Sequence, residues 1–174
     1  GKYGDSYGFN GNDSIVEIQD DETFDFNKEI TAYVKANPRK GGNGSGDRSL
    51  NLFSKRWGGG GFHDIKFELG YDANNRITWT LGLDDDIKLG RLTSSSSLNP
   101  NSGWHSIAGT YSSETDRLRI YIDSELSAEK TVEADNITSI DDENVYIGGG
   151  DVFSDTYYFD GKMYGVRLYN RSLT

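Results

Sequence analysis

The sequence predicts an all-β protein, an antiparallel sandwich or barrel. Short runs in which apolar and polar residues alternate recur along the chain, as they do in half-buried strands. Turn-forming clusters separate these runs at spacings of about 8 to 12 residues, and no segment repeats its apolar residues with the period of a helix. A length of 174 residues fits one domain covering residues 1–174.

The first long strand is expected at 30–36. Ile30, Ala32 and Val34 alternate there with Thr31 and Tyr33, so one set faces a core and the other faces outward. The segment also contains good helix formers, but its apolar period is two. A shorter strand is expected before it at 14–19, and another after it at 50–56.

The strands that follow rest on the same alternation. In segment 65–69, Ile65 and Phe67 are expected to face inward and Lys66 outward. Trp79 alternates with apolar neighbours in 77–81 and is expected in the core, whereas Tyr121 is an outward residue of 118–122. The remaining expected strands are 86–92, 104–111, 126–132, 144–148 and 162–169, and turn clusters at 72–75, 94–101, 112–116 and 148–151 separate them.

Composition excludes several functions. With 28 acidic and 18 basic residues the net charge is -10, so a nucleic acid partner is not expected. No stretch is apolar enough for membrane insertion. The chain has no cysteine and two histidines, His63 and His105, which rules out disulfides and thiolate zinc sites and argues against a histidine-based metal site.

Five segments together resemble a known family. They are FNGNDSIVEI at 9–18, GWHSIAGTY at 103–111, LRIYID at 118–123, VYIGG at 145–149 and FDGKMYGVRLYNRSL at 159–173. In this order they resemble the laminin-G-like, concanavalin A-like jelly-roll family, which includes pentraxins and carbohydrate-binding modules. The resemblance implies a two-sheet antiparallel β-sandwich. One departure is that Ser124 stands where the family usually has glycine after Asp123.

The resemblance also implies a structural calcium ion where the opening and closing segments meet. Asn10, Asn12, Asp13 and Asp160 lie on the matching segments, and their oxygen atoms are the ligands that Ca²⁺ prefers. The alternative is that residues 10–13 form only a turn, which Asn, Gly and Asp favour for backbone reasons.

A sugar site needs an exposed aromatic surface with hydrogen-bonding groups around it. Trp57 ends a strand and enters four glycines, where exposure is expected. The other candidate ligand-binding residues are Tyr71, Tyr157 and Tyr158 for stacking, and Lys55, Arg56 and His63 for hydrogen bonds. The alternative is that each aromatic covers an edge of a core that is poor in aliphatic residues.

Catalysis is not expected. Glu17, Gln19 and Glu22 superficially resemble the carboxylate-bearing strand of jelly-roll glucanases, but Gln19 stands where the central Asp is needed. These residues are therefore expected to form a solvated edge. No motif indicates a Ser-His-Asp arrangement either.

The preferred hypothesis is a non-catalytic carbohydrate-binding module that binds a polysaccharide or oligosaccharide. We expect a monomer, secreted or at the cell surface, attached to catalytic or surface domains of a larger protein. The alternative is an adhesion or spacer domain without sugar binding. The acidic composition favours neutral or basic glycans, although a basic patch at Arg39, Lys40, Arg48, Lys55 and Arg56 would reverse this preference.

Overall fold

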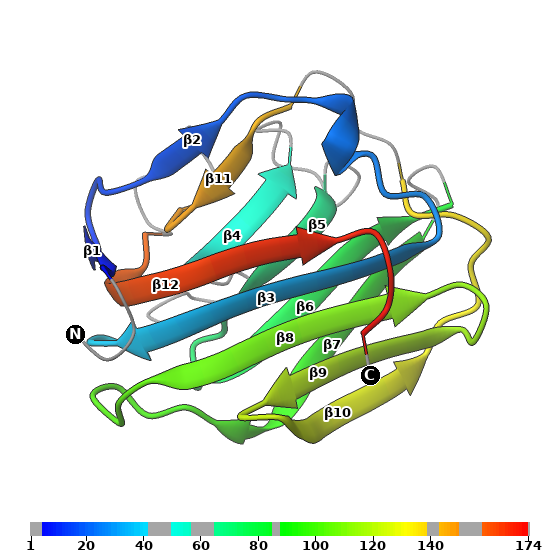
Figure 1. Ribbon diagram of the computed structural model, residues 1–174. Helices are drawn as coiled ribbons and strands as arrows, with labels where there is room; N and C mark the ends of the chain where they lie inside the picture. Colours follow the sequence, from blue (N-terminus) through cyan, green and yellow to red (C-terminus); the bar gives the residue numbers. More distant parts are fainter. Residues whose placement is uncertain are drawn as a thin grey trace.

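Two facing sheets form the molecule. The computed structural model describes residues 5–41, 50–56, 65–84, 88–138, 143–149 and 158–173, and these contain two antiparallel sheets of six strands each. Sheet A has the strand order β1-β12-β3-β8-β9-β10 and sheet B the order β2-β11-β4-β5-β6-β7. Sheet A lies in front of sheet B in Figure 1. The predicted two-sheet antiparallel sandwich is confirmed.

Most predicted strands are present, with ends that differ by a few residues. The described elements are β1 (Tyr7–Asn10), β2 (Val16–Ile18), η1 (Glu22–Phe24), β3 (Glu29–Pro38), β4 (Leu50–Arg56), β5 (Ile65–Tyr71), β6 (Arg76–Leu83), β7 (Lys88–Ser97), β8 (His105–Ser112), β9 (Arg117–Ile122), β10 (Glu125–Thr131), β11 (Val145–Ile147) and β12 (Asp160–Tyr169). In this described part, no helix has the length and apolar content needed to cross a membrane.

One local prediction was wrong. Residues from 94 onward were expected to form a turn, yet β7 continues to Ser97 because the Ser94 hydroxyl accepts the backbone N–H of Ile77 at 2.9 Å and donates to the carbonyl of Ser96. No helix was expected, and among the described residues the short 3-10 turn η1 forms where the Asp21 side chain accepts the backbone N–H of Thr23. Side-chain hydrogen bonds to the backbone decide both cases.

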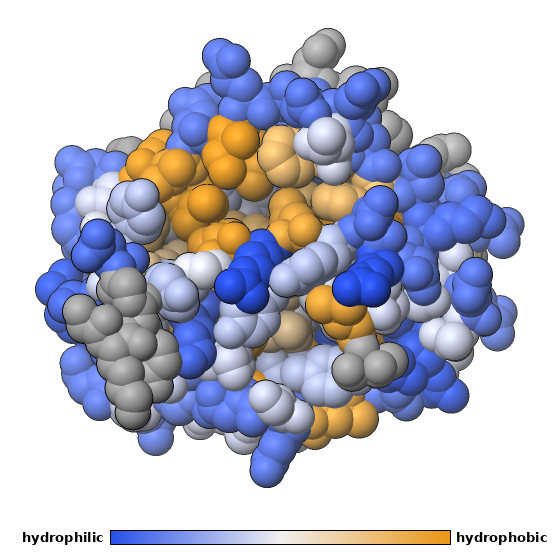
Figure 2. Space-filling view, viewed as in Figure 1, coloured by the Kyte–Doolittle hydropathy of each residue, from blue (hydrophilic) through white to orange (hydrophobic). Residues whose placement is uncertain are grey.

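The core lies between the sheets and confirms the predicted alternation. Ile30, Val34 and Trp79 are completely buried. One side of the sandwich is less well covered, since β1 pairs only with residues 160–163 of β12. Beside it, Val16 and Ile18 of the edge strand β2 are more than a third exposed, and Figure 2 shows apolar side chains gathered between β2 and β12.

Candidate functional site

A hollow of about 410 Å³ lies on the outer face of sheet A, which is turned toward the viewer in Figures 1 and 2. Its size is within the range of about 300 to 1,000 Å³ found for small-ligand sites. Strands β3, β8, β9 and β12 and the C-terminal segment form it. The lining residues are Thr31, Tyr33, Ser106, Ile107, Ala108, Thr110, Tyr121, Ser124, Arg167, Tyr169 and Leu173.

The strand register places two tyrosines on either side of a small residue. Tyr33 of β3 lies opposite Ala108 of β8, and Ala108 lies opposite Tyr121 of β9. Neighbouring strands are about 4.8 Å apart, so the two tyrosines are rooted about 10 Å apart with the alanine between them. Arg167 of β12 lies opposite Tyr33 on its other side, and its guanidinium carbon is 5.7 Å from the ring centroid.

A β-bulge in β12 turns Arg167 and Tyr169 toward the hollow. The pairing of β12 with β3 shifts between Tyr164 and Arg167, where Gly165 has a φ of 64°. Glycine adopts this left-handed conformation without steric cost. Met163, before the bulge, is buried in the core. Without the extra residue, strict alternation would place Arg167 on the same face as Met163.

Two threonines give the hollow its polar floor. The Thr31 hydroxyl donates to the carbonyl of Arg171 at 2.7 Å and accepts the backbone N–H of Leu173 at 2.9 Å, which holds the C-terminal segment at one end of the hollow. Thr110 is only 1% exposed, and its hydroxyl has no hydrogen-bond partner. Such an orphaned group costs about 1 to 3 kcal/mol, and Thr110 is one of the residues that line the hollow.

Sequence reasoning did not select these residues, although part of the signal was present. The alternation correctly placed Tyr33 and Tyr121 on outward faces. What was missing was the pairing of β3 with β8 and of β8 with β9, because a period-two pattern does not say which strands are neighbours.

Of the aromatic residues that the sequence selected, the two that the structure describes, Tyr71 and Tyr158, do not line this hollow. Trp57, His63 and Tyr157 lie outside the described residues. Tyr71 is 2% exposed, its ring stacks on that of Phe159 with centroids 6.3 Å apart, and burial raises its pKa. Tyr71 is therefore a core residue, which corrects the prediction that it offers a surface to a sugar.

Tyr158 is half-buried beside strand β4 of sheet B. It forms an isolated parallel bridge with Asn51, and a Cβ added at Gly149 would lie 3.1 Å from its ring. This position is on the opposite sheet from the hollow. The structure thus does not bring Tyr158 together with Tyr33 or Tyr121.

Lys55 is a completely buried ion-pair residue. Its ammonium pairs with Asp20 and lies 3.6 Å from a carboxylate oxygen of Asp25. Lys66, also completely buried, donates to the same Asp25 oxygen at 2.8 Å. The pairing of β4 with β5 is irregular at this point, and this bulge explains why Lys66 does not face outward as predicted. Because Lys55 is engaged in this cluster, it has no exposed surface for a sugar.

Arg56 belongs to a second polar cluster, on sheet B. It pairs with Glu68 of the neighbouring strand at 3.0 Å. Burial raises the pKa of Glu68, and the positive charges of Arg56 and Arg91 offset only part of this effect. Single polar atoms of Asn51, Ser54 and Arg56 in this cluster are buried without a hydrogen-bond partner.

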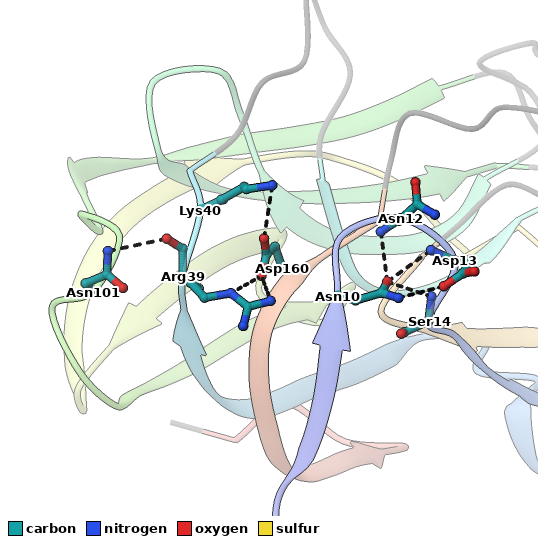
Figure 3. Close-up of polar contacts among 8 residues, drawn as sticks. All are labelled: Asn10, Asn12, Asp13, Ser14, Arg39, Lys40, Asn101 and Asp160. Carbon is teal, nitrogen blue, oxygen red and sulfur yellow. Dashed lines mark hydrogen bonds and ion pairs between the residues drawn. The ribbon is translucent and has the colours of Figure 1, made fainter.

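The predicted calcium ligands form two separate groups (Figure 3). In the first, the side-chain oxygen of Asn10 accepts the backbone N–H groups of Asn12, Asp13 and Ser14 at 2.9 to 3.2 Å. The Asn10 amide also donates to Asp13 at 2.7 Å. This is the turn that the alternative interpretation described.

In the second group, Asp160 is 3% exposed and faces two cations. Arg39 Nε donates to its carboxylate at 2.6 Å, and Lys40 Nζ lies 3.4 Å from the other oxygen. Figure 3 shows this carboxylate pointing toward Arg39 and Lys40, while the Asn10 side chain points toward Asp13.

As placed, these donors do not fit a calcium ion. The Asp160 carboxylate is already neutralised by two positive charges. Moreover, the described residues contain no cluster of three or more His, Asp or Glu side chains able to hold a metal. Calcium binding here stays a prediction, and it requires Arg39 and Lys40 to move away from Asp160.

A Ser-His-Asp contact, for which the sequence carried no motif, is present beside the hollow. His105 Nδ1 lies 2.7 Å from Asp123 Oδ2, and its Nε2 lies 2.8 Å from the Ser102 hydroxyl. That hydroxyl donates to the carbonyl of Asn99, and Asp123 also accepts the backbone N–H of Ser106. The group therefore ties the turn before β8 to the β9–β10 turn.

Both glutamates of the glucanase-like segment, Glu17 and Glu22, are exposed, in agreement with the predicted solvated edge. Glu17 accepts hydrogen bonds from the Asn144 side chain and from the Tyr146 hydroxyl, which joins β2 to β11. Glu22 lies in η1. Glu17 therefore acts as a bonding partner between neighbouring strands.

Comparisons with known proteins agree with this fold. A sequence model described as the concanavalin A-like lectin/glucanases superfamily matches residues 10–174. No curated protein sequence matches the chain.

Solved structures resemble the chain in fold. The CBM40 domain of the Ruminococcus gnavus IT-sialidase, bound to α2,3 sialyllactose, has a TM-score of 0.68 at 19% identity, covering 84% of this chain and 78% of that chain. A SAP-like pentraxin from Limulus polyphemus has a TM-score of 0.65 at 11% identity, with coverage of 96% and 76%. Domains LG4-5 of the mouse laminin alpha1 chain have a TM-score of 0.68 at 14% identity, and the chain spans 43% of their length.

Proposed function

The chain belongs to the concanavalin A-like lectin/glucanase superfamily, and we propose that it is a non-catalytic carbohydrate-binding module whose site is the hollow of sheet A. The observation that carries the proposal is the pair Tyr33 and Tyr121 flanking Ala108 above the orphaned hydroxyl of Thr110. Tyrosine rings contact the apolar face of a sugar, and their hydroxyls remain able to bond its hydroxyls.

The dimensions support a sugar of one or a few rings. The two tyrosines are rooted about 10 Å apart, which leaves room for one pyranose above Ala108. The hollow is open to solvent along the face of the sheet, so a longer polysaccharide can continue beyond it. Because the ligand lies on a sheet surface, its binding requires no rearrangement of the core.

The wider setting is also part of the proposal. A module of this kind holds an attached catalytic or cell-surface domain against its glycan, outside the cell. The folds with which the chain compares include a sialidase CBM40 domain bound to sialyllactose, which makes 3'-sialyllactose and lactose natural first probes.

The test is a glycan array followed by titration of the glycans that bind. Tyr33→Ala and Tyr121→Ala should each weaken binding about tenfold or more, because each removes one stacking surface. Tyr7→Ala is the matched control, since Tyr7 is a 71% exposed strand tyrosine that does not line the hollow. If both hollow variants bind like the wild type, the proposed site is wrong.

Two further arms address the predictions made from sequence. Trp57→Ala tests the site first expected beside the four glycines, and loss of binding only in this variant would move the site there. Titration with and without a chelator tests calcium, and binding that disappears on chelation would support the calcium prediction. Release of reducing sugars would contradict the non-catalytic assignment.

One observation favours the alternative, an adhesion or spacer domain. Ile15, Val16 and Ile18 are each more than a third exposed beside the open side of the sandwich, where another protein surface could pack. Light scattering of the purified chain tests this alternative. A stable wild-type dimer that Val16→Glu converts to a monomer would support it. A wild-type chain that is already monomeric would not support it.

A further inference from the structure

Arg167 is the only charged residue among the described residues that line the hollow. No ion pair joins it to a carboxylate in the described part of the chain, and its one recorded partner is the ring of Tyr33. Elsewhere on the same face of the sheet, Arg117 and Arg119 are both paired with Glu129. A guanidinium that has no counter-charge among the described residues, in a chain of net charge -10, is a binding group for an anion.

The guanidinium lies over the Tyr33 ring, at the side of the hollow. Arg167 and Tyr33 lie opposite each other in the strand register, and the guanidinium sits 5.7 Å from the ring centroid. A guanidinium held over an aromatic face by a cation–π contact keeps N–H donors for other partners, and these donors lie along one planar edge. That edge can donate two parallel hydrogen bonds to a carboxylate or to a sulfate ester.

Thr110 supplies a second, differently oriented group. It lies in the next row of the sheet, opposite Thr31, and its buried hydroxyl has no partner. A sugar whose acidic group is held by Arg167 can direct a ring hydroxyl to Thr110 while a face of the ring contacts Tyr33. Two polar anchors and one stacking surface determine the orientation of a single pyranose.

The net charge of the chain does not oppose this arrangement strongly. At physiological ionic strength, charges further apart than about 8 Å are largely screened, so distant carboxylates have little effect on an anion in contact with Arg167. The local charge therefore outweighs the acidic composition, which had favoured neutral or basic glycans.

We infer that the hollow selects acidic sugars, with Arg167 binding the carboxylate or sulfate ester of the residue that stacks on Tyr33. The inference rests on the proposed function, because it specifies the ligand class of the same site. Carboxylated and sulfated sugars share the chemistry that Arg167 recognises, and the probes below separate them.

The experiment compares matched pairs of glycans that differ only in charge. The pairs are polygalacturonate with its methyl ester, 3'-sialyllactose with lactose, and dextran sulfate with dextran, each titrated by calorimetry. The acidic member of at least one pair should bind about tenfold to a hundredfold more tightly. Preference in the first two pairs assigns a carboxylate, and preference only in the third assigns a sulfate ester.

Variants connect the preference to Arg167. Arg167→Gln should remove the difference between the members of the pair, whereas Arg167→Lys should keep part of it because the charge remains but the planar donor edge is lost. Lys162→Gln is the matched control, since it removes one positive charge from the same strand at an exposed residue outside the hollow.

The outcomes separate this inference from the proposed function. Suppose that sugars bind and that Tyr33→Ala abolishes this binding. If no pair then shows a preference for its acidic member, or if Arg167→Gln retains that preference, the module binds glycans but the inferred selection of acidic sugars by Arg167 is wrong. If none of the six glycans and no glycan of the array binds, the proposed function is wrong as well.

Discussion

Replacing Gly109 by alanine would place a methyl group inside the indole of Trp79. A Cβ built at Gly109 lies 2.4 Å from Cδ2, 2.7 Å from Cγ and 2.9 Å from Cε2 of that ring. Carbon atoms in a packed core are separated by about 3.5 to 4.0 Å, so the ring or the strand must shift. Trp79 is completely buried, so any shift of the ring also disturbs its core neighbours.

The expected loss of stability follows from two effects. Overpacking a close-packed core costs about 1 to 3 kcal/mol. A displaced indole also loses the hydrogen bond that Trp79 Nε1 donates to the carbonyl of Thr110 at 3.2 Å, which contributes about 1 kcal/mol. We therefore expect Gly109→Ala to lower the free energy of unfolding by about 2 to 4 kcal/mol. Urea unfolding monitored by tryptophan fluorescence measures this change.

The control is Gly8→Ala in β1, where an added Cβ meets nothing within 4 Å. That variant should stay within about 0.5 kcal/mol of the wild type. If Gly109→Ala is equally harmless, Trp79 does not pack against β8 as described, and the placement of the core under the hollow is wrong.

Three further predictions concern strain and buried charge. Ser124→Gly should raise the free energy of unfolding by about 1 kcal/mol, because a φ of 71° costs a non-glycine residue about this amount. An unchanged thermal midpoint would show that the turn is not strained. Lys66→Met should change the free energy of unfolding by less than about 1 kcal/mol, whereas Asp25→Asn should lower it by about 2 kcal/mol after allowance for the partial exposure of Asp25. The reason is that only Asp25→Asn removes a negative charge that compensates two buried ammonium groups. Equal effects of the two variants in urea unfolding would contradict this. Because burial raises the pKa of Glu68 above 4.5, the folded state keeps this proton to a higher pH than the unfolded chain, so stability should fall as the pH rises through the raised pKa. Glu68→Gln should reduce this dependence of stability on pH. A variant whose free energy of unfolding depends on pH as in the wild type would refute the prediction.

Much of the fold could be predicted because strand alternation is a local property. Segment 50–56 was predicted with the ends that β4 has, and Trp79 was placed in the core by its two apolar neighbours. Lys66 shows where this reasoning stops. One extra residue in a strand reverses the face of a side chain, and nothing in the alternation of segment 65–69 reveals the bulge.

The candidate site was less predictable because it depends on pairing between distant segments. Residues 33, 108, 121 and 167 become neighbours only through the order β12-β3-β8-β9. Lys55 was selected for its charge, yet the same charge is used in the core by Asp20 and Asp25. Composition shows which groups a chain contains, and only the register shows which of them remain available to a ligand.

Strand β8 explains why the core and the hollow occur together. Gly109 faces inward and leaves space for the indole of Trp79, while Ala108 faces outward and leaves space between Tyr33 and Tyr121. Because successive residues of a strand point to opposite faces, two adjacent small residues leave space on both faces of the sheet at the same point. The small residues Ala108 and Gly109 of this strand therefore make room for the buried indole on one face and create the surface to which we assign binding on the other.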